Sequence, residues 1–391
     1  MGALIGILGG GQLARMLALA GHPLGLRFRV LDPAPDAPAG AVAEHICGSY
    51  EDKAALNHFA LDVSVITYEF ENVPASSVEH LATHVHQRAP IYPPPLALAT
   101  GQDRLLEKQL FERLGIGVPR FASVDSLSDL EAAVMELGRP AVLKTRRLGY
   151  DGKGQARIME GTDLGAAYRA LCPADARPGG LILEEFVAFD VEASVIAVRS
   201  RTGEVRTWPL VLNEHSSGIL RRSRAPLAAF WSGAGSASTA SLDEQATVAA
   251  TRIMEALDYV GVLAVEFFVK EGRLLASEIA PRVHNSGHWT IEGSITSQFE
   301  NHLRAVAGLP LGETGMRFAG AAAVMHNLVG AVPEVGEPTG LLGVPGCHVH
   351  LYGKSARPGR KVGHATVVGA PAEIAVRSEQ LRSIADQYWQ A

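Results

Sequence analysis

One stretch, residues 262–289, limits the folds open to this chain more than any other. Two runs rich in branched and aromatic residues flank a short polar turn centred on Gly272, which predicts a β-hairpin. The two runs are Val262–Val269 and Leu274–Ala280. Folding the hairpin symmetrically about Gly272 places Glu266 directly opposite Glu278, and opposed side chains lie about 5 Å apart. At this distance, two carboxylates in an apolar hairpin repel each other, so one of them tends to bind a proton.

A divalent cation between the two carboxylates would remove this repulsion. Oxygen ligands suit Mg²⁺, which proteins commonly hold together with phosphate groups. Alternatively, both glutamates could face solvent, although Phe267, Phe268 and Ile279 leave little room for a wet face. The hairpin therefore predicts a Mg²⁺ site at Glu266 and Glu278.

Polar residues crowd together with Pro and Gly directly after the second strand. They are Arg282, His284, Asn285 and His288. This composition is typical of a functional loop at the end of a strand. His284 and His288 at four-residue spacing also suggest zinc, but Asn-Ser-Gly between them breaks a helix and no third ligand is apparent.

The composition is that of an ordinary globular protein. The 391 residues predict two or three domains, and the net charge of −6 argues against general nucleic-acid binding. The three cysteines lie far apart without zinc or redox spacing, which predicts a reducing, cytoplasmic location. Met1 leads into the strand-like LIGIL without a basic start, so we expect no signal peptide. No apolar run reaches the roughly 18 residues of a membrane span.

The N-terminal region reads as a βαβ unit with a glycine loop. A strand at Ala3–Leu8 precedes the G-x-G-x-x-A pattern of Gly9–Ala14, and a second strand ends in Asp32. Such a loop can hold any phosphate at a helix N-terminus, but a tight turn between strand and helix explains it equally well. A further strand near Val63–Tyr68 ends at Glu69, Glu71 and Asn72. These three could contact a sugar or an amine, or cap the next helix.

A cationic, glycine-rich loop follows the strand Ala141–Thr145, which carries Lys144. The loop contains Gly149, Gly152 and Gly154 beside Arg146, Arg147 and Lys153. Mobile backbone with exposed N–H groups and cations is suited to closing over a polyphosphate. A basic hairpin tip is the alternative.

Three later segments carry further candidate ligands. Leu181–Val187 and Glu192–Ser200 read as strands with acidic residues that could hold an adenine amine and ribose hydroxyls, while Asn213–Leu220 reads as a polar turn. Near the C-terminus, Lys354, Arg357, Arg360 and Lys361 share one glycine-rich turn between strands, which a solvated basic hairpin would also explain.

In this order, the motifs resemble the ATP-grasp superfamily and, within it, the N5-carboxyaminoimidazole ribonucleotide synthetases of purine biosynthesis. The segments that carry the resemblance are GILGGGQLARM (Gly6–Met16), YEFENVP (Tyr68–Pro74), KTRRLGYDGKGQ (Lys144–Gln155), SEIAPRVHNSGHWT (Ser277–Thr290) and HLYGKSARPGRKVGH (His350–His364).

The resemblance implies a mixed α/β and α+β fold with a Rossmann-like pre-ATP-grasp domain, an ATP-grasp domain and a small β-rich C-terminal domain. We place these at residues 1–95, 96–308 and 309–391. It implies an enzyme that carboxylates 5-aminoimidazole ribonucleotide with bicarbonate, using ATP and Mg²⁺. The reaction would pass through carboxyphosphate and release ADP and phosphate. We further expect a cytoplasmic homodimer that binds neither nucleic acid nor membrane.

The resemblance also assigns residues. Those implied to bind ATP are Arg104, Lys144, Gly149, Tyr150, Asp151, Gly152, Lys153, Gly154, Gln155, Glu184, Glu185, Phe186, Val187, Glu192, His215, Ser277 and Glu278. The catalytic set is Lys144, Arg282, His284 and Asn285, where the Arg282 guanidinium suits bicarbonate. The ribonucleotide set is Gly10, Gly11, Gln12, Leu13, Glu69, Asn72, Tyr150, Lys354, Arg360 and Lys361. Ser277 departs from the family's signature, which usually has Asn there.

Within the ribonucleotide set, we predict that the basic turn and the glycine loop meet across a cleft and share the substrate phosphate. The alternatives are another ATP-grasp ligase, such as a formate-dependent glycinamide ribonucleotide transformylase, an NAD-dependent oxidoreductase based on Gly9–Ala14 and Asp32, or a non-catalytic nucleotide sensor.

Overall fold

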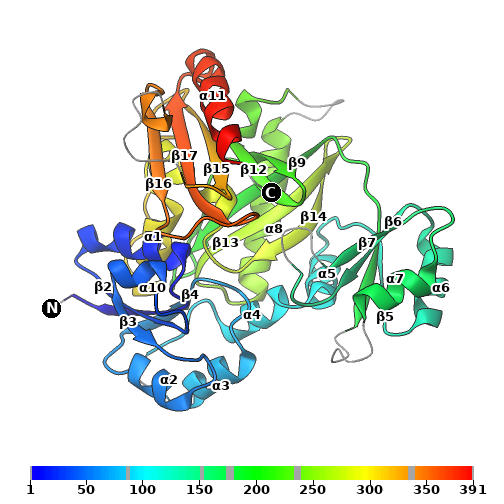
Figure 1. Ribbon diagram of the computed structural model, residues 1–391, viewed down its shortest axis with the longest axis horizontal. Helices are drawn as coiled ribbons and strands as arrows, with labels where there is room; N and C mark the ends of the chain where they lie inside the picture. The colour runs from blue at the N-terminus through cyan, green and yellow to red at the C-terminus, as the bar shows by residue number, and fades with distance from the viewer. Residues whose placement is uncertain are drawn as a thin grey trace.

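The computed structural model describes residues 2–84, 89–149, 154–172, 180–232, 239–332 and 340–389. Its described strands form three sheets, of four, nine and four strands. Figure 1 shows the N-terminal sheet and the large sheet side by side. The small sheet, whose strands lie between these two in the sequence, is set apart at one end of the molecule. None of the helices in these ranges is both long and apolar enough to cross a bilayer.

The N-terminal sheet is parallel, with strand order β3-β2-β1-β4. Its strands are β1 (Leu4–Leu8), β2 (Arg27–Asp32), β3 (Glu44–Cys47) and β4 (Val65–Tyr68), and its helices are α1 (Gln12–Gly21), α2 (Lys53–Phe59) and α3 (Ala75–His84). Every residue of β1 and β4 is buried, as expected for parallel strands covered on both faces. The predicted Rossmann-like opening is confirmed.

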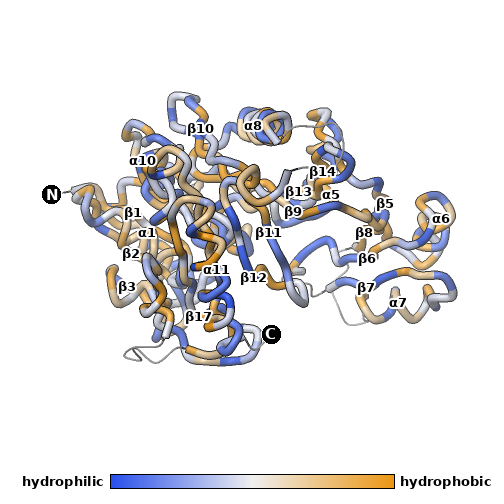
Figure 2. Tube along the Cα trace, turned by 90° about the horizontal axis from the view of Figure 1, so that it is seen from above, coloured by the Kyte–Doolittle hydropathy of each residue, from blue (hydrophilic) through white to orange (hydrophobic). Residues whose placement is uncertain are grey.

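The small sheet is antiparallel, with strand order β5-β8-β6-β7. Its elements are β5 (Phe121–Val124), α6 (Leu127–Leu137), β6 (Ala141–Thr145), β7 (Gln155–Ile158), α7 (Leu164–Leu171) and β8 (Leu181–Glu185). Figures 1 and 2 agree that these strands and the two helices project from the rest of the molecule. Two further helices, α4 (Pro95–Gly101) and α5 (Arg104–Arg113), connect this unit to the N-terminal sheet.

The large sheet has the order β14-β13-β9-β11-β12-β15-β17-β16, and β10 also pairs with β9. Its strands are β9 (Val191–Arg199), β10 (Val205–Thr207), β11 (Val211–Ser216), β12 (Ile219–Ala225), β13 (Gly261–Lys270), β14 (Arg273–Ala280), β15 (Ala322–Val329), β16 (Cys347–Leu351) and β17 (Lys361–Gly369). Its helices are α8 (Thr239–Ala256), α9 (Thr290–Gly293), α10 (Gln298–Ala307) and α11 (Pro371–Ala385). Because β12 pairs with β15, the C-terminal strands continue the same sheet.

One prediction in this sheet was only partly correct. Within residues 213–220, Ser217 and Gly218 form a turn, but the residues on either side belong to strands β11 and β12. Asn213 is buried, and its amide donates to Ser194 and accepts from Ser223 on the neighbouring strands. These side chains look like loop residues in the sequence because the partners that satisfy them lie far away along the chain.

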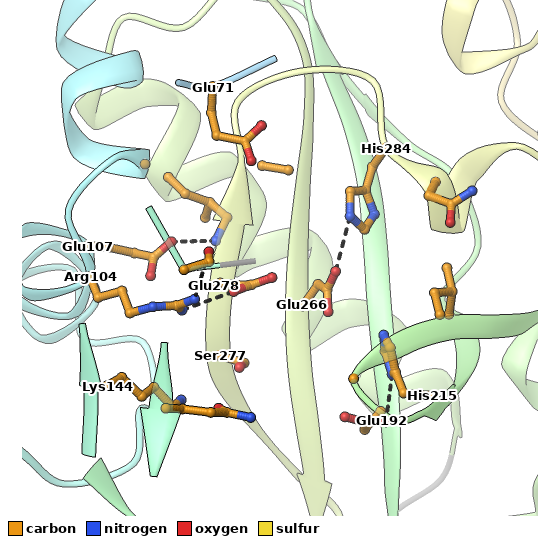
Figure 3. Close-up of a pocket in the computed structure, with 18 of the residues that line it drawn as sticks. Glu71, Arg104, Glu107, Lys144, Glu192, His215, Glu266, Ser277, Glu278 and His284 are labelled. Carbon is orange, nitrogen blue, oxygen red and sulfur yellow. Dashed lines mark hydrogen bonds and ion pairs between the residues drawn. The ribbon is translucent and has the colours of Figure 1, made fainter. Parts of the chain in front are cut away.

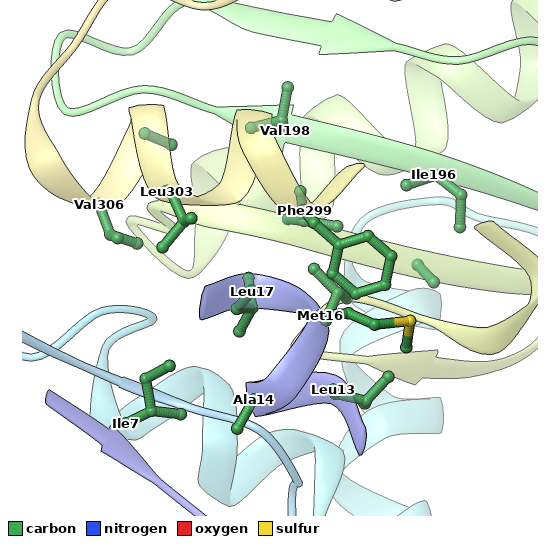
Figure 4. Close-up of a cluster of buried hydrophobic side chains, with 14 of the residues drawn as sticks. Ile7, Leu13, Ala14, Met16, Leu17, Ile196, Val198, Phe299, Leu303 and Val306 are labelled. Carbon is green, nitrogen blue, oxygen red and sulfur yellow. The ribbon is translucent and has the colours of Figure 1, made fainter. Parts of the chain in front are cut away.

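The N-terminal sheet is fixed to the large sheet through α1 and α10. Leu13, Met16 and Leu17 of α1 pack with Phe299 and Leu303 of α10 in one buried cluster (Figure 4). Fully burying such a side chain contributes roughly 1.5–3 kcal/mol. This packing holds the glycine loop in front of α1 close to the large sheet.

Candidate active site

A cavity of about 750 Å³ lies where the three sheets meet. The N-terminal sheet contributes the segments after β1 and β4, the small sheet contributes β6 and β8, and the large sheet contributes the β13–β14 hairpin and the loop after it. Figure 3 shows its side chains facing one another from these elements.

The hairpin is confirmed, and its register brings the two predicted carboxylates together. A two-residue turn, Glu271–Gly272, has φ of 50° and 75° and pairs Lys270 with Arg273. A bulge then shifts the register so that Glu266 pairs with Glu278.

The electrostatics of this pair suit a cation. Burial and the charge of Glu278 raise the pKa of Glu266 to about 7. Burial also acts to raise the pKa of Glu278, but Arg104, whose Nη1 donates to it at 3.1 Å, brings that pKa below its usual value. Within the described ranges, no three His, Cys, Asp or Glu side chains are grouped to hold a metal. The two glutamates fit Mg²⁺ if phosphate or water oxygens complete its ligands.

Lys144 lies on the other side of the cavity, where its Nζ is 3.0 Å from Glu184 Oε2. Lys108, which is fully buried, approaches the same carboxylate oxygen at 3.5 Å. Despite burial, these two ammonium groups hold the pKa of Glu184 at about 2. Arg104 Nη2 also donates to the carbonyl of Gly149 at 3.5 Å, so the start of the cationic, glycine-rich loop lies beside the carboxylate pair.

The predicted adenine and ribose side of the cavity is also assembled. The cavity wall there includes Glu185, Phe186, Val187, Glu192, His215, Ser277 and Gln155. Phe189 and Phe268 stack there with ring centroids 4.8 Å apart. Although burial lowers it, a 2.8 Å hydrogen bond to Glu192 raises the pKa of His215 above its usual value.

The predicted catalytic loop after β14 lines the same cavity. Arg282 Nε donates to Glu71, and its Nη1 donates to the carbonyl of Val283 at 3.1 Å. The guanidinium holds the pKa of Glu71 at about 2 despite burial. The amide of Asn285 exchanges two hydrogen bonds with Asn327 on β15.

A directed chain of hydrogen bonds fixes the tautomer of His284. Asn213 Nδ2 donates to Ser194 Oγ, which donates to Ser286 Oγ, each at 2.8 Å. The Ser286 hydroxyl therefore donates to His284 Nδ1, also at 2.8 Å. Burial keeps the pKa of His284 well below its usual range, so the neutral ring carries its proton on Nε2, 3.1 Å from Glu266 Oε1.

The glycine loop is held by carboxylates of the protein itself. Gly10 N donates to Asp32 and Ala14 N donates to Glu69, each at 2.8 Å. Asp32 also accepts from Ala34 N and from the Tyr50 hydroxyl. The acid that would bind a dinucleotide ribose thus stabilises the turn, which does not favour an NAD-dependent oxidoreductase.

The basic turn reaches the glycine loop as predicted. Lys354 Nζ donates to the side chain of Gln12, and burial lowers the pKa of Lys354 while Glu69 acts to raise it. Lys361, Gln12, Leu13, Glu69 and Asn72 line the cavity. Four other predicted ribonucleotide residues are not among the lining residues: Gly10, Gly11, Lys354 and Arg360. Arg360 donates to Ser355 within its own turn.

Some predicted positions cannot be placed. Tyr150, Asp151, Gly152 and Lys153 lie outside the described residues. Of the same loop, Gly154 has φ of 72°, and its carbonyl accepts from Thr145 N at 2.8 Å. The sequence assigned no role to Glu107, Lys108, Ser194 or Ser286. For Glu107 and Lys108 the one available signal was their charge, since both stand at positions of α5 that lie within an otherwise apolar core.

Three family models match the chain. They are the ribonucleotide synthetase preATP-grasp domain over residues 2–102, the ATP-grasp domain over 109–299, and the phosphoribosylaminoimidazole carboxylase C-terminal domain over 323–378. An N5-carboxyaminoimidazole ribonucleotide synthase of Pseudomonas aeruginosa is 51% identical, over 93% of this chain and 94% of the relative.

Solved structures agree over nearly the whole length. The N5-carboxyaminoimidazole ribonucleotide synthetase of Thermus thermophilus has a TM-score of 0.87 at 51% identity, covering 97% of this chain and 98% of that one. The Aspergillus clavatus enzyme, solved with ADP and 5-aminoimidazole ribonucleotide, has a TM-score of 0.84 at 30% identity, covering 99% of each chain. The predicted ATP-grasp fold is confirmed, and the chain belongs to the N5-carboxyaminoimidazole ribonucleotide synthase family of ATP-grasp enzymes.

Proposed function

We propose that this protein uses ATP and bicarbonate to carboxylate the amine of 5-aminoimidazole ribonucleotide, releasing ADP and phosphate. One observation carries the proposal: a single cavity holds the opposed Glu266–Glu278 pair, Lys144 from the small sheet, and the Arg282–His284 loop. The family membership supports the same reaction, and the Aspergillus relative was solved with ADP and this ribonucleotide.

Glu266 and Glu278 would hold Mg²⁺, and Arg104 and Lys144 would contact the ATP phosphates. The carboxylate pair fits the ion because burial and the charge of Glu278 together raise the pKa of Glu266 to about 7, and a bound cation would relieve both effects. When bound, Mg²⁺ would offset the negative charge of the phosphates. Lys144 and Arg104 supply further positive charge from two different elements, β6 and α5.

In the first step, a bicarbonate oxygen attacks the γ-phosphorus, and the bond from that phosphorus to ADP breaks. The product is carboxyphosphate, which is a better carboxyl donor than bicarbonate. Arg282 suits bicarbonate because a guanidinium binds planar oxyanions through paired hydrogen bonds. The neutral His284, held by Ser286, would orient the bound bicarbonate.

In the second step, the substrate amine forms a bond to the carboxyl carbon of carboxyphosphate, or of CO₂ released from it. Phosphate leaves and the amine loses a proton. The substrate's own phosphate would lie at the far side of the cavity, near Gln12, Lys354 and Lys361. The contact between Lys354 and Gln12 supports this, because it joins the basic turn to the start of α1.

ADP release tests the proposal directly. We expect bicarbonate-dependent turnover that 5-aminoimidazole ribonucleotide stimulates. Glycinamide ribonucleotide with formate should give no turnover, and that pair is the matched control for another ATP-grasp ligase. Turnover with the control pair, or no ATP turnover at all, would reject the proposal. The homodimer, the cytoplasmic location and the division at residues 95 and 308 stay predictions.

A further inference from the structure

The edge of the large sheet beside the carboxylate pair is covered by two consecutive charged residues of α5. β14 is an edge strand in the described sheet order, so one side of its backbone has no strand partner. Glu107 and Lys108 face this side and are almost completely buried, at 2% and 0% exposure. Glu184 lies 3.5 Å from the Lys108 ammonium group. A buried ammonium group is costly unless several acceptors surround it, so its other donors need partners as well.

Lys108 holds the carbonyl groups at the bulge. Its Nζ donates to Ser277 O at 2.7 Å and to Ala276 O at 3.3 Å. Ser277 is the additional residue of the bulge, because Glu266 pairs with Glu278 while Phe267 pairs with Ala276. Lys108 therefore binds the backbone at the point where the register shifts.

Glu107 binds the backbone on the other side of Glu278. Its Oε1 accepts from Ile279 N at 2.6 Å. Figure 3 shows Glu107 on the side of Glu278 that faces α5. Residues 107 and 108 thus bind the peptide groups on both sides of Glu278, while Arg104, one turn earlier on α5, binds its side chain. Three residues of one helix face fix a four-residue segment of β14.

We propose that Lys108 and Glu107 are positioning residues that keep Glu278 in its metal-binding place by holding the bulge of β14. This rests on the proposed function, because it takes Glu266 and Glu278 as the Mg²⁺ ligands. Neither residue is required to touch the metal. Groups that orient metal ligands typically change metal affinity by about 10–100-fold when they are removed.

The test is a titration of Mn²⁺ into the full-length protein at saturating ADP, with free Mn²⁺ followed by electron paramagnetic resonance. Lys108→Met, which removes the donors at similar volume, should raise the half-saturating Mn²⁺ concentration at least about tenfold. Glu107→Met should raise it as well, and this variant serves if Lys108→Met fails to fold. Glu107→Gln keeps an acceptor for Ile279 N and should stay within about twofold of the wild type.

Leu110→Ala is the matched control for destabilisation. Leu110 is buried on the same helix and belongs to the same hydrophobic cluster as Ala276 and Ile279, but its side chain cannot hydrogen-bond to the β14 backbone, so it separates packing from hydrogen bonding. This variant should lower the melting temperature and leave the Mn²⁺ titration unchanged. An equal loss of Mn²⁺ affinity in Leu110→Ala would overturn the inference, as would a folded Lys108→Met with wild-type affinity.

Glu278→Gln separates this inference from the proposed function. If Glu278→Gln abolishes Mn²⁺ binding while Lys108→Met and Glu107→Met do not change it, only the positioning role is wrong. If Glu278→Gln binds Mn²⁺ like the wild type, the metal assignment fails and the positioning role fails with it.

Discussion

Glu266 lies directly opposite Glu278 only because Ser277 is the additional residue of a β-bulge. The turn that pairs Lys270 with Arg273 would, without the bulge, pair Glu266 with Ser277. Side chains alternate between the two faces of a strand, so Glu278 would then point to the opposite face of the sheet. The bulge therefore creates the carboxylate pair.

The first prediction concerns this pair. Glu278→Gln should lower ATP turnover by at least about a hundredfold, because a neutral amide does not balance Mg²⁺. Glu266→Gln should act in the same direction. The measurement is ADP release at saturating ATP, bicarbonate and ribonucleotide.

The stability of the same variants provides the control. In metal-free buffer, Glu266→Gln should unfold at the same or a higher urea concentration than the wild type, because it removes one of two repelling carboxylates. Lost activity with unchanged stability supports the metal role. Near-normal ADP release from Glu278→Gln would refute it.

Local patterns made much of this fold predictable. The buried strand before the glycine loop, the hairpin around Gly272 and the strand that carries Lys144 all appear where the sequence places them. The starts of α2, α5 and α6 are likewise set by local residues, since Asp52, Asp103 and Ser126 accept hydrogen bonds from their first turns. These features depend on residues that are close together in the chain.

The remaining features depend on distant partners. The symmetric fold about Gly272 paired the right glutamates, but the true turn and the bulge each shift the register, and the sequence shows neither. Lys108 meets Ser277 across 169 positions, so its role is visible only once α5 lies against β14. Likewise, the glycine loop of Gly9–Ala14 is held by Glu69, which lies 55 positions from Ala14.

The second prediction concerns the tautomer of His284. Ser286→Ala removes the hydroxyl donor to Nδ1 and leaves only the longer contact from the Ser286 backbone N–H, at 3.4 Å. It should lower kcat roughly fivefold to tenfold, the effect of one lost hydrogen bond. The KM for ATP should stay the same. Nitrogen NMR of His284 should show loss of the pure Nε2–H form.

Ser194→Ala is the graded control, because it lies one hydrogen bond further from the ring. Its effect on kcat should be smaller than that of Ser286→Ala. An unchanged nitrogen spectrum in Ser286→Ala would show that the serine chain does not set the tautomer.

The third prediction concerns the ribonucleotide phosphate. Lys354→Ala combined with Arg360→Ala should raise the KM for the ribonucleotide tenfold or more, because charge-assisted contacts contribute about 1.5–3 kcal/mol each. Lys354→Ala alone should give most of this change, since Lys354 reaches Gln12 whereas Arg360 reaches Ser355. The KM for ATP should barely change.

Arg357→Ala is the matched control, an exposed cation of the same turn. It should leave both KM values unchanged. Equal increases in both KM values for Lys354→Ala would indicate general damage, and an increase for ATP alone would place the turn at the wrong substrate.

The last prediction concerns His302, which joins the N-terminal sheet to the large sheet. It is fully buried, its Nδ1 accepts from Val262 N at 3.1 Å, and its Nε2 therefore donates to Thr67 Oγ1 at 2.8 Å. Burial lowers the pKa of His302 to about 4. Below pH 6.5 the unfolded chain binds a proton at this histidine, whereas the folded chain does not until about pH 4. Stability should therefore fall as the pH drops through this window, by up to roughly 3 kcal/mol.

His302→Asn isolates this effect, because the amide oxygen can still accept from Val262 N but does not titrate. At pH 7 the variant should be less stable than the wild type by about 1 kcal/mol, through loss of the bond to Thr67. In urea unfolding, this difference should shrink from pH 6.5 to pH 4 and then reverse, while other buried histidines such as His326 contribute equally to both proteins and cancel. A difference that stays constant from pH 7 to pH 4 would show that His302 is not held neutral at this junction.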